Sequence, residues 1–131
     1  MASNGDKVEL SGEGTFSIHP KSVTGGGTFV HRAPDGTVRG SGTWTAERLL
    51  AFHSYGNGIP QGLPADFEGG LALILVHISP SAGGSFNGIL KVYCLLGAPP
   101  KGVHEGLRLS VEGVINFNKQ VSGDTLFIRL P

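Results

Sequence analysis

Apolar and polar side chains alternate strictly over residues 8–18, which is the pattern of a β-strand with one buried face. The polar set consists of Glu9, Ser11, Glu13, Thr15 and Ser17. The opposite set consists of Val8, Leu10, Gly12, Gly14, Phe16 and Ile18. The same alternation recurs over residues 22–32 and from residue 38 onward, so the first third of the chain predicts three successive strands.

A short phrase, Gly-x-Gly-Thr-aromatic, marks each of these predicted strands. Its copies begin at Gly12, Gly25 and Gly40 and end on Phe16, Phe29 and Trp44. This spacing is too short for a repeat unit of a solenoid but suits adjacent strands of a meander. The phrase therefore predicts how the strands are arranged, and by itself it indicates almost nothing about biochemical function.

The turns between these strands predict how the copies of the phrase face each other. Residues 19–22 and 33–36 contain proline and are interpreted as four-residue turns. Turns of this length place Gly14 opposite Gly27, and Gly27 opposite Gly42. In that register each aromatic residue of the phrase lies over a glycine of the neighbouring strand, an arrangement that stabilises glycine-bearing strands.

The rest of the chain predicts more strands and no long amphipathic helix. The third strand is expected to reach Phe52, and residues 53–70 are expected to be irregular because they contain five glycines and two prolines. The nearly continuous apolar run over residues 71–79 predicts a strand buried on both faces. Three further strands are predicted over residues 88–96, 107–117 and 125–130.

This order predicts an all-β protein, a small antiparallel β-barrel of about seven to eight strands in meander order. The alternative is a two-sheet β-sandwich. Residues 1–7 are polar and are predicted to form a flexible N-terminal tail, and residues 8–131 a single β-barrel domain.

Charge and composition narrow the possible partners. Lys and Arg together number 10, as do Asp and Glu, so no excess of positive charge favours nucleic acid. The longest apolar run is far too short to span a bilayer, so no membrane insertion is expected. A formal net charge of zero does not resist self-association, which leaves a homodimer or higher homo-oligomer possible.

The sequence leaves the cellular compartment open. The polar residues 1–7 lack the apolar run of a signal peptide, which indicates a cytoplasmic protein if the chain is complete. An exported protein whose signal peptide had been removed would also begin without such an apolar run. Cys94 is the only cysteine, which excludes an intrachain disulfide.

The interior glycines have two interpretations. They can allow a sheet to curve sharply, or they can leave a space in which an apolar small molecule binds. In the second interpretation the predicted ligand-binding residues are Phe16, Phe29, Trp44, His53 and Tyr93. A nucleotide is not expected, because each glycine phrase is followed by strand and turn and not by the start of a helix.

Titratable residues suggest an enzyme as an alternative. His77 lies within an apolar run, and the segment expected to be irregular holds Tyr55 and Glu68. These three residues are the predicted catalytic groups, acting as general acid or base in a cyclase or isomerase with a barrel cavity. The five histidines show no close pairing, so neither a metal site nor any other cofactor is expected.

The sequence thus leaves three functions open. The first is a barrel that binds an apolar small molecule, and the second is the cyclase or isomerase. The third is a self-associating structural or assembly protein.

Overall fold

The computed structural model of the chain describes residues 1–130. They form a single antiparallel sheet whose strands follow one another in the order β1 to β7, while β8 pairs with β4. One 3-10 turn, η1 (Ile59–Gln61), interrupts the strands. The strands are β1 (Lys7–Ile18), β2 (Lys21–Arg32), β3 (Val38–Asn57), β4 (Phe67–Pro80), β5 (Phe86–Cys94), β6 (Gly106–Val111), β7 (Ile115–Phe117) and β8 (Phe127–Ile128).

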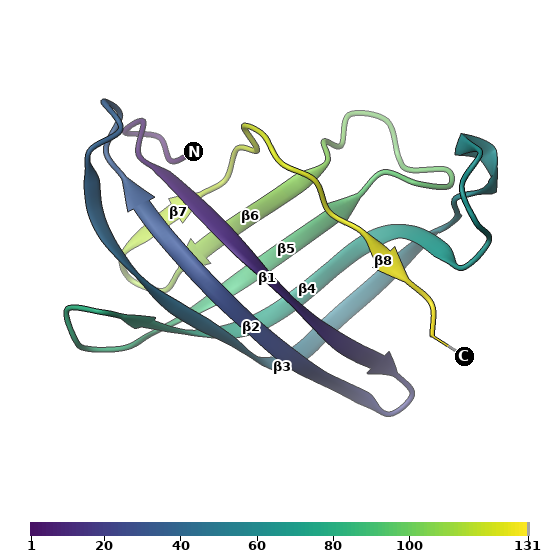
Figure 1. Cartoon of the computed structure of the whole chain (residues 1–131), viewed down its shortest axis with the longest axis horizontal. Helices are drawn as coiled ribbons and strands as arrows, with labels where there is room; N and C mark the ends of the chain where they lie inside the picture. The colour runs from purple at the N-terminus through teal and green to yellow at the C-terminus, as the bar shows by residue number, and fades with distance from the viewer. Residues whose placement is uncertain (131) are drawn as a thin grey trace.

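The prediction of an all-β fold with antiparallel strands in meander order is confirmed. In Figure 1, β1 and β2 form a layer that crosses in front of the layer made by β4 to β7, and the long β3 leads from one layer to the other. The sheet curls into a barrel-like shape without closing, because no hydrogen-bonded ladder joins β1 to β7 within residues 1–130. No helix in the described part of the chain is long and apolar enough to cross a membrane.

The first hairpin is tighter than its sequence predicted. Ile18 pairs with Lys21, so only His19 and Pro20 remain in the loop. Gly14 therefore lies opposite Gly25, and the prediction that it faces Gly27 is wrong. Because the register moves by two residues, the side chains of both strands stay on their predicted faces.

The register of the second hairpin differs from the prediction by two residues in the opposite direction. Its loop has five residues, and a bulge between His31 and Arg32 adds one more residue on β3. Trp44 lies opposite Gly27 and Phe29 opposite Gly42. The predicted pairing of Gly27 with Gly42 is therefore wrong, although two of the three aromatic residues of the phrase do face a glycine.

The glycines of the phrase allow neighbouring strands to approach closely. A Cβ atom on Gly27 would collide with the carbonyl oxygen of Ser11 on β1, and one on Gly42 with the carbonyl oxygen of Ser79 on β4. A Cβ on Gly12 would lie 2.6 Å from Cζ2 of Trp44. The interpretation that these glycines serve curvature and close packing is therefore the one that the backbone supports.

Several strand limits differ from those predicted, most of all the end of β3 and the strand predicted over residues 107–117. The strand β3 continues to Asn57 through bulges that include one between Ser54 and Gly56, so only residues 58–66 separate it from β4. Glycines that resembled loop residues in the sequence lie instead in irregular strand. The predicted strand over residues 107–117 is two strands, because a turn at Glu112 to Val114 separates β6 from β7.

The strand β4 is buried on one face only, contrary to the prediction. Its inward side chains form the centre of the core, with Ala72 and Val76 fully buried. Leu71, Leu73 and Leu75 point to the other face and stay partly exposed. The physical reason is that no second layer covers the outer face of the sheet within residues 1–130.

Residues 1–6 lie against one end of the sheet. Ala2 is 5% exposed, and its amide donates to the carbonyl oxygen of Asp6. The amino group of Met1 donates to the carbonyl oxygen of Lys119. The flexibility of this segment stays a prediction, whereas its contacts place it beside β2, β3 and the C-terminal residues.

Candidate functional site

A hollow lies between the edge of β1 and the last part of the chain. We call residues 119–130 the C-terminal strap. The pocket has a volume of about 530 Å³ and is bounded by β1 and β2 on one side and by β4, β5 and β6 on the other. Its apolar walls are Leu10, Phe16, Val23, Trp44, Ala46, Ile74, Leu90, Val92, Leu107, Leu126 and Phe127.

Trp44 is fixed across this space from β3 to β1. Its indole Nε1 donates a hydrogen bond of 3.1 Å to the carbonyl oxygen of Ser11. The ring has room to lie there because Gly12 has no side chain. The indole is 8% exposed, so it forms a fixed wall and not a loose surface group.

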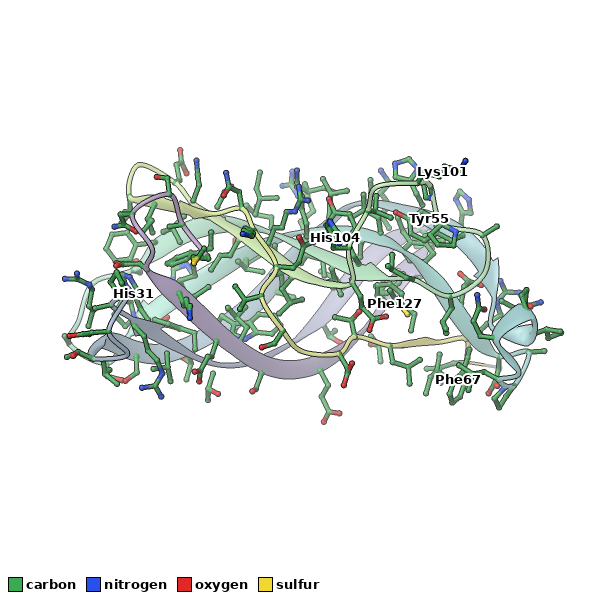
Figure 2. The ribbon with its side chains drawn as sticks, turned by 90° about the horizontal axis from the view of Figure 1, so that it is seen from above. His31, Tyr55, Phe67, Lys101, His104 and Phe127 are labelled. Atoms are coloured by element: carbon green, nitrogen blue, oxygen red, sulfur yellow. The ribbon has the colours of Figure 1, made fainter. Side chains whose placement is uncertain are left out.

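The C-terminal strap closes the space on the side opposite β1. The hydroxyl of Thr125 donates to the carbonyl oxygen of Tyr93, and the amide of Arg129 donates to that of Asp66 over 2.7 Å. Between these two points β8 pairs with Phe67 and Glu68 at the start of β4. In Figure 2 the strap passes from the upper side of the molecule to the lower, with Phe127 near the middle of the long axis and His31 near one end.

Three aromatic rings close one end of the pocket. The ring centroids of Phe16 and Phe52 are 5.0 Å apart, and Phe127 contacts both rings edge-on at 5.8 and 5.2 Å. Edge-to-face packing at these distances is favourable beyond the burial of area alone. Phe127 brings the strap to this cluster, so the aromatic contact joins the strap to β1 and β3.

Two more hollows adjoin the central pocket along β1. The first has a volume of about 430 Å³, includes Lys7 and Lys119 in its wall, and shares Leu10 and Leu107 with the central pocket. The second has a volume of about 640 Å³ and extends past Phe16 toward Glu68. Because neighbouring hollows share wall residues, the three lie in a row along β1, and we call this row the β1 groove.

The predicted ligand-binding residues separate into two groups. Phe16 and Trp44 line the β1 groove, and Phe29 lines a smaller pocket of about 150 Å³ on the other side of Trp44. His53 and Tyr93 lie on the outer face of the sheet, on either side of Leu71. The structure therefore does not bring these five residues into one site.

The three predicted catalytic residues are likewise apart. Glu68 lies at one end of the β1 groove and pairs with Arg129. His77 is on the outer face of the same strand, with its Nδ1 atom 3.7 Å from Glu47. Nine residues of extended chain separate Glu68 from His77, a span of roughly 30 Å. These two groups cannot act on one substrate atom.

Tyr55 lies near Tyr93, which is on the outer face of the sheet. Burial, and then the neighbouring phenol of Tyr93, raise the pKa of Tyr55 above its ordinary value. The guanidinium carbon of Arg108 lies 5.3 Å from the centre of the Tyr93 ring. In Figure 2, Tyr55 and Lys101 lie at the same end of the molecule, on the side away from Phe67.

A buried ionic cluster was missed by the sequence analysis. Asp6 is 3% exposed, and its Oδ2 atom lies 2.7 Å from Nε2 of His31 and 3.2 Å from Nε of Arg39. Its other oxygen, Oδ1, is buried without a hydrogen-bond partner. The ring of His31 packs edge-on against Phe117 at 5.3 Å. The polar composition of residues 1–7 resembles a tail, and nothing in it signals this anchoring role.

Metal-ligating and nucleophilic groups are sparse. Within residues 1–130 no three His, Cys, Asp or Glu side chains come together as a metal site. Cys94 is 1% exposed, and burial raises the pKa of its thiol. A buried thiol of this kind is a poor nucleophile at neutral pH.

Comparisons with known proteins identify no relative. No protein-family model, no curated protein and no solved structure matches the chain. Any functional conclusion must therefore be argued from the groove itself.

Proposed function

We propose that the protein binds an apolar small molecule in the β1 groove. The observation that carries this proposal is the central pocket of about 530 Å³ with eleven apolar side chains in its walls. Ligand pockets generally measure roughly 300–1,000 Å³ and are lined mainly by hydrophobic and aromatic groups. A molecule placed there would remove apolar surface from water where it contacts these side chains, which is the main source of affinity.

The fixed position of Trp44 supports the same proposal. Its hydrogen bond to Ser11 and the absence of a side chain at Gly12 hold one wall of the groove before any ligand arrives. A wall that is already ordered does not have to lose side-chain entropy on binding. The strap supplies the opposite wall, and β8 pairs with only two residues of β4. We therefore assign the route of entry to the gap between β1 and the strap.

The structure gives less support to the other two functions, the cyclase or isomerase and the self-associating protein. The separation of Glu68 from His77 argues against the predicted acid–base group of a cyclase or isomerase. The partly exposed Leu73 and Leu75 could pair two copies through the outer face of β4. However, Lys91 and Arg108 lie directly opposite each other on that face, and a symmetric pair would repeat their like charges. A homo-oligomer stays a prediction.

The proposal can be tested with a neutral fluorescent probe. N-phenyl-1-naphthylamine should bind with one site per chain and become brighter as it leaves water. The substitution Val92→Phe fills part of the groove and should weaken binding by about tenfold or more. Ile89→Phe adds a similar ring on the outer face of the same strand and should leave binding unchanged. Equal binding by both variants, or a probe that stays dark, would contradict the proposal.

A further inference from the structure

We infer that the ligand of the β1 groove is a long-chain carboxylate, with its hydrocarbon chain along β1 and its carboxylate between Lys7 and Lys119. This inference rests on the proposed function and adds the chemical class and the orientation of the ligand.

The shape of the groove favours a long ligand. Its three hollows follow β1 from Lys7 at one end to Ile18 at the other. At about 3.3 Å per residue, this strand spans roughly 36 Å. A compact ring system would occupy the central pocket and leave its neighbours empty, whereas a flexible alkyl chain can contact Leu10 and Leu107 and continue toward Phe16.

The charges at the two ends of the groove differ. Lys7 and Lys119 both line the hollow at one end, and neither forms an ion pair with a carboxylate within residues 1–130. Both charges act on the amino group of Met1, whose pKa is lowered first by burial and then by Lys119 and Lys7. The amino groups of Met1, Lys7 and Lys119 outnumber the carboxylates of this hollow, Glu9 and Asp124, and this excess of positive charge favours an anion there.

Four acidic groups line the groove, and two of them, Glu9 and Glu68, are paired with arginines. In the wall beside Lys7, Glu9 accepts a hydrogen bond of 3.0 Å from Nε of Arg32. Asp124 lines both this hollow and the central pocket. At the far end Glu68 pairs with Arg129, and Glu13 is also in the wall. Acidic groups outnumber basic groups at the far end, and basic groups outnumber acidic groups beside Lys7 and Lys119. A carboxylate therefore favours the Lys7 end, which gives the ligand one orientation.

Both parts of the inference can be measured with matched ligands. The probes are dodecanoate, dodecan-1-ol and hexanoate, each below its aggregation limit, titrated by displacement of N-phenyl-1-naphthylamine. Dodecanoate should bind about tenfold more tightly than dodecan-1-ol, since two exposed ion pairs contribute modestly. Hexanoate should bind at least tenfold more weakly than dodecanoate, because its chain buries six fewer methylene groups.

Two double variants isolate the head group. Lys7→Gln with Lys119→Gln should abolish the preference for dodecanoate over dodecan-1-ol and leave the affinity for the alcohol unchanged. Lys21→Gln with Lys101→Gln removes the same charge away from the groove and should keep the preference. Exposed substitutions of this type change stability little, so all variants should fold.

The outcomes separate this inference from the proposed function. Equal affinity for dodecanoate and dodecan-1-ol would overturn the carboxylate assignment and leave the groove as a binding site. A preference that survives in the Lys7 and Lys119 variant would overturn the orientation. Hexanoate binding as tightly as dodecanoate would overturn the long chain. If the probe bound but neither long-chain molecule displaced it, the long-chain assignment would be overturned and the groove would remain a site for other apolar molecules. If the probe itself did not bind, the proposed function would fail as well.

Discussion

The indole of Trp44 spans the curled sheet to donate its Nε1 proton to the carbonyl oxygen of Ser11, over 3.1 Å. The bond joins β3 to β1, two strands that are separated by β2 in the hydrogen-bonded order. It depends on Gly12, the neighbour of Ser11, because any side chain there would meet the ring. Gly12 in the first copy of the phrase and Trp44 at the end of the third copy thus take part in the same contact.

Gly12→Ala is expected to destabilise the protein by about 1–3 kcal/mol, the usual cost of forcing atoms into a packed site. The added methyl group would lie 2.6 Å from Cζ2 of Trp44 and closer still to the carbonyl oxygen of Gly26. Gly40→Ala is the matched control in the same phrase, because a Cβ there meets nothing within 4 Å. Urea unfolding of both variants measures the difference, and equal midpoints would show that Gly12 does not make room for the indole.

Asp6→Asn is expected to lower the free energy of unfolding by about 1.5–3 kcal/mol, the range for hydrogen bonds to charged groups. The change removes the negative charge that faces His31 and Arg39 and leaves a single neutral amide oxygen to accept from them. Asp66→Asn removes the same charge at an exposed position and should change stability by less than about 0.5 kcal/mol. Thermal unfolding of the two variants compares them. An unchanged midpoint for Asp6→Asn would mean that the charge of Asp6 does not stabilise the fold.

Phe127→Ala should loosen the strap and weaken binding of the neutral probe. The substitution removes the ring that packs against both Phe16 and Phe52, and with it one wall of the groove. Ile128→Ala alters the next residue, which is 48% exposed, and should have little effect. Proteolysis near residues 119–126 should also become faster in Phe127→Ala, because the strap opens more often. Equal probe binding and equal proteolysis rates in Phe127→Ala and Ile128→Ala would contradict a specific role for Phe127.

Cys94 gives the stability of the protein a defined dependence on pH. Burial raises the pKa of its thiol above the ordinary value of 9.0, so the unfolded chain releases this proton first as pH rises. The stabilising contribution is complete below about pH 8 and is lost as pH rises through the folded-state pKa. Cys94→Ala lacks the group, so the difference in unfolding free energy between wild type and variant should shrink from pH 8 to pH 10. A difference that stayed constant over this range would refute the effect.

The alternation of side chains predicted which residues face inward, but not their partners. Both hairpins differ from the predicted register by two residues, and an even shift keeps Phe16, Phe29 and Trp44 on the inward face. Loop length could not be deduced from the proline turns, because strands can take up or release residues at either end of a loop. The bulge between His31 and Arg32 has no signal in the sequence either.

The candidate site was predictable only in part, for a related reason. Phe16 and Trp44 were identifiable because the phrase places them on the inward face of strands near the start of the chain. His77, His53 and Tyr93 were chosen for their chemistry, and their strands direct them outward. Asp6 and the strap residue Phe127 act through contacts with residues far away in sequence, which local patterns do not record.

The most direct test of the β1 groove is a set of intermolecular nuclear Overhauser effects between bound dodecanoate and the methyl groups of the protein. The account predicts contacts from the alkyl chain to Leu10, Val92 and Leu107, and none to Leu73 or Leu75 on the outer face. Contacts confined to the outer leucines, or no contacts at saturating dodecanoate, would contradict it.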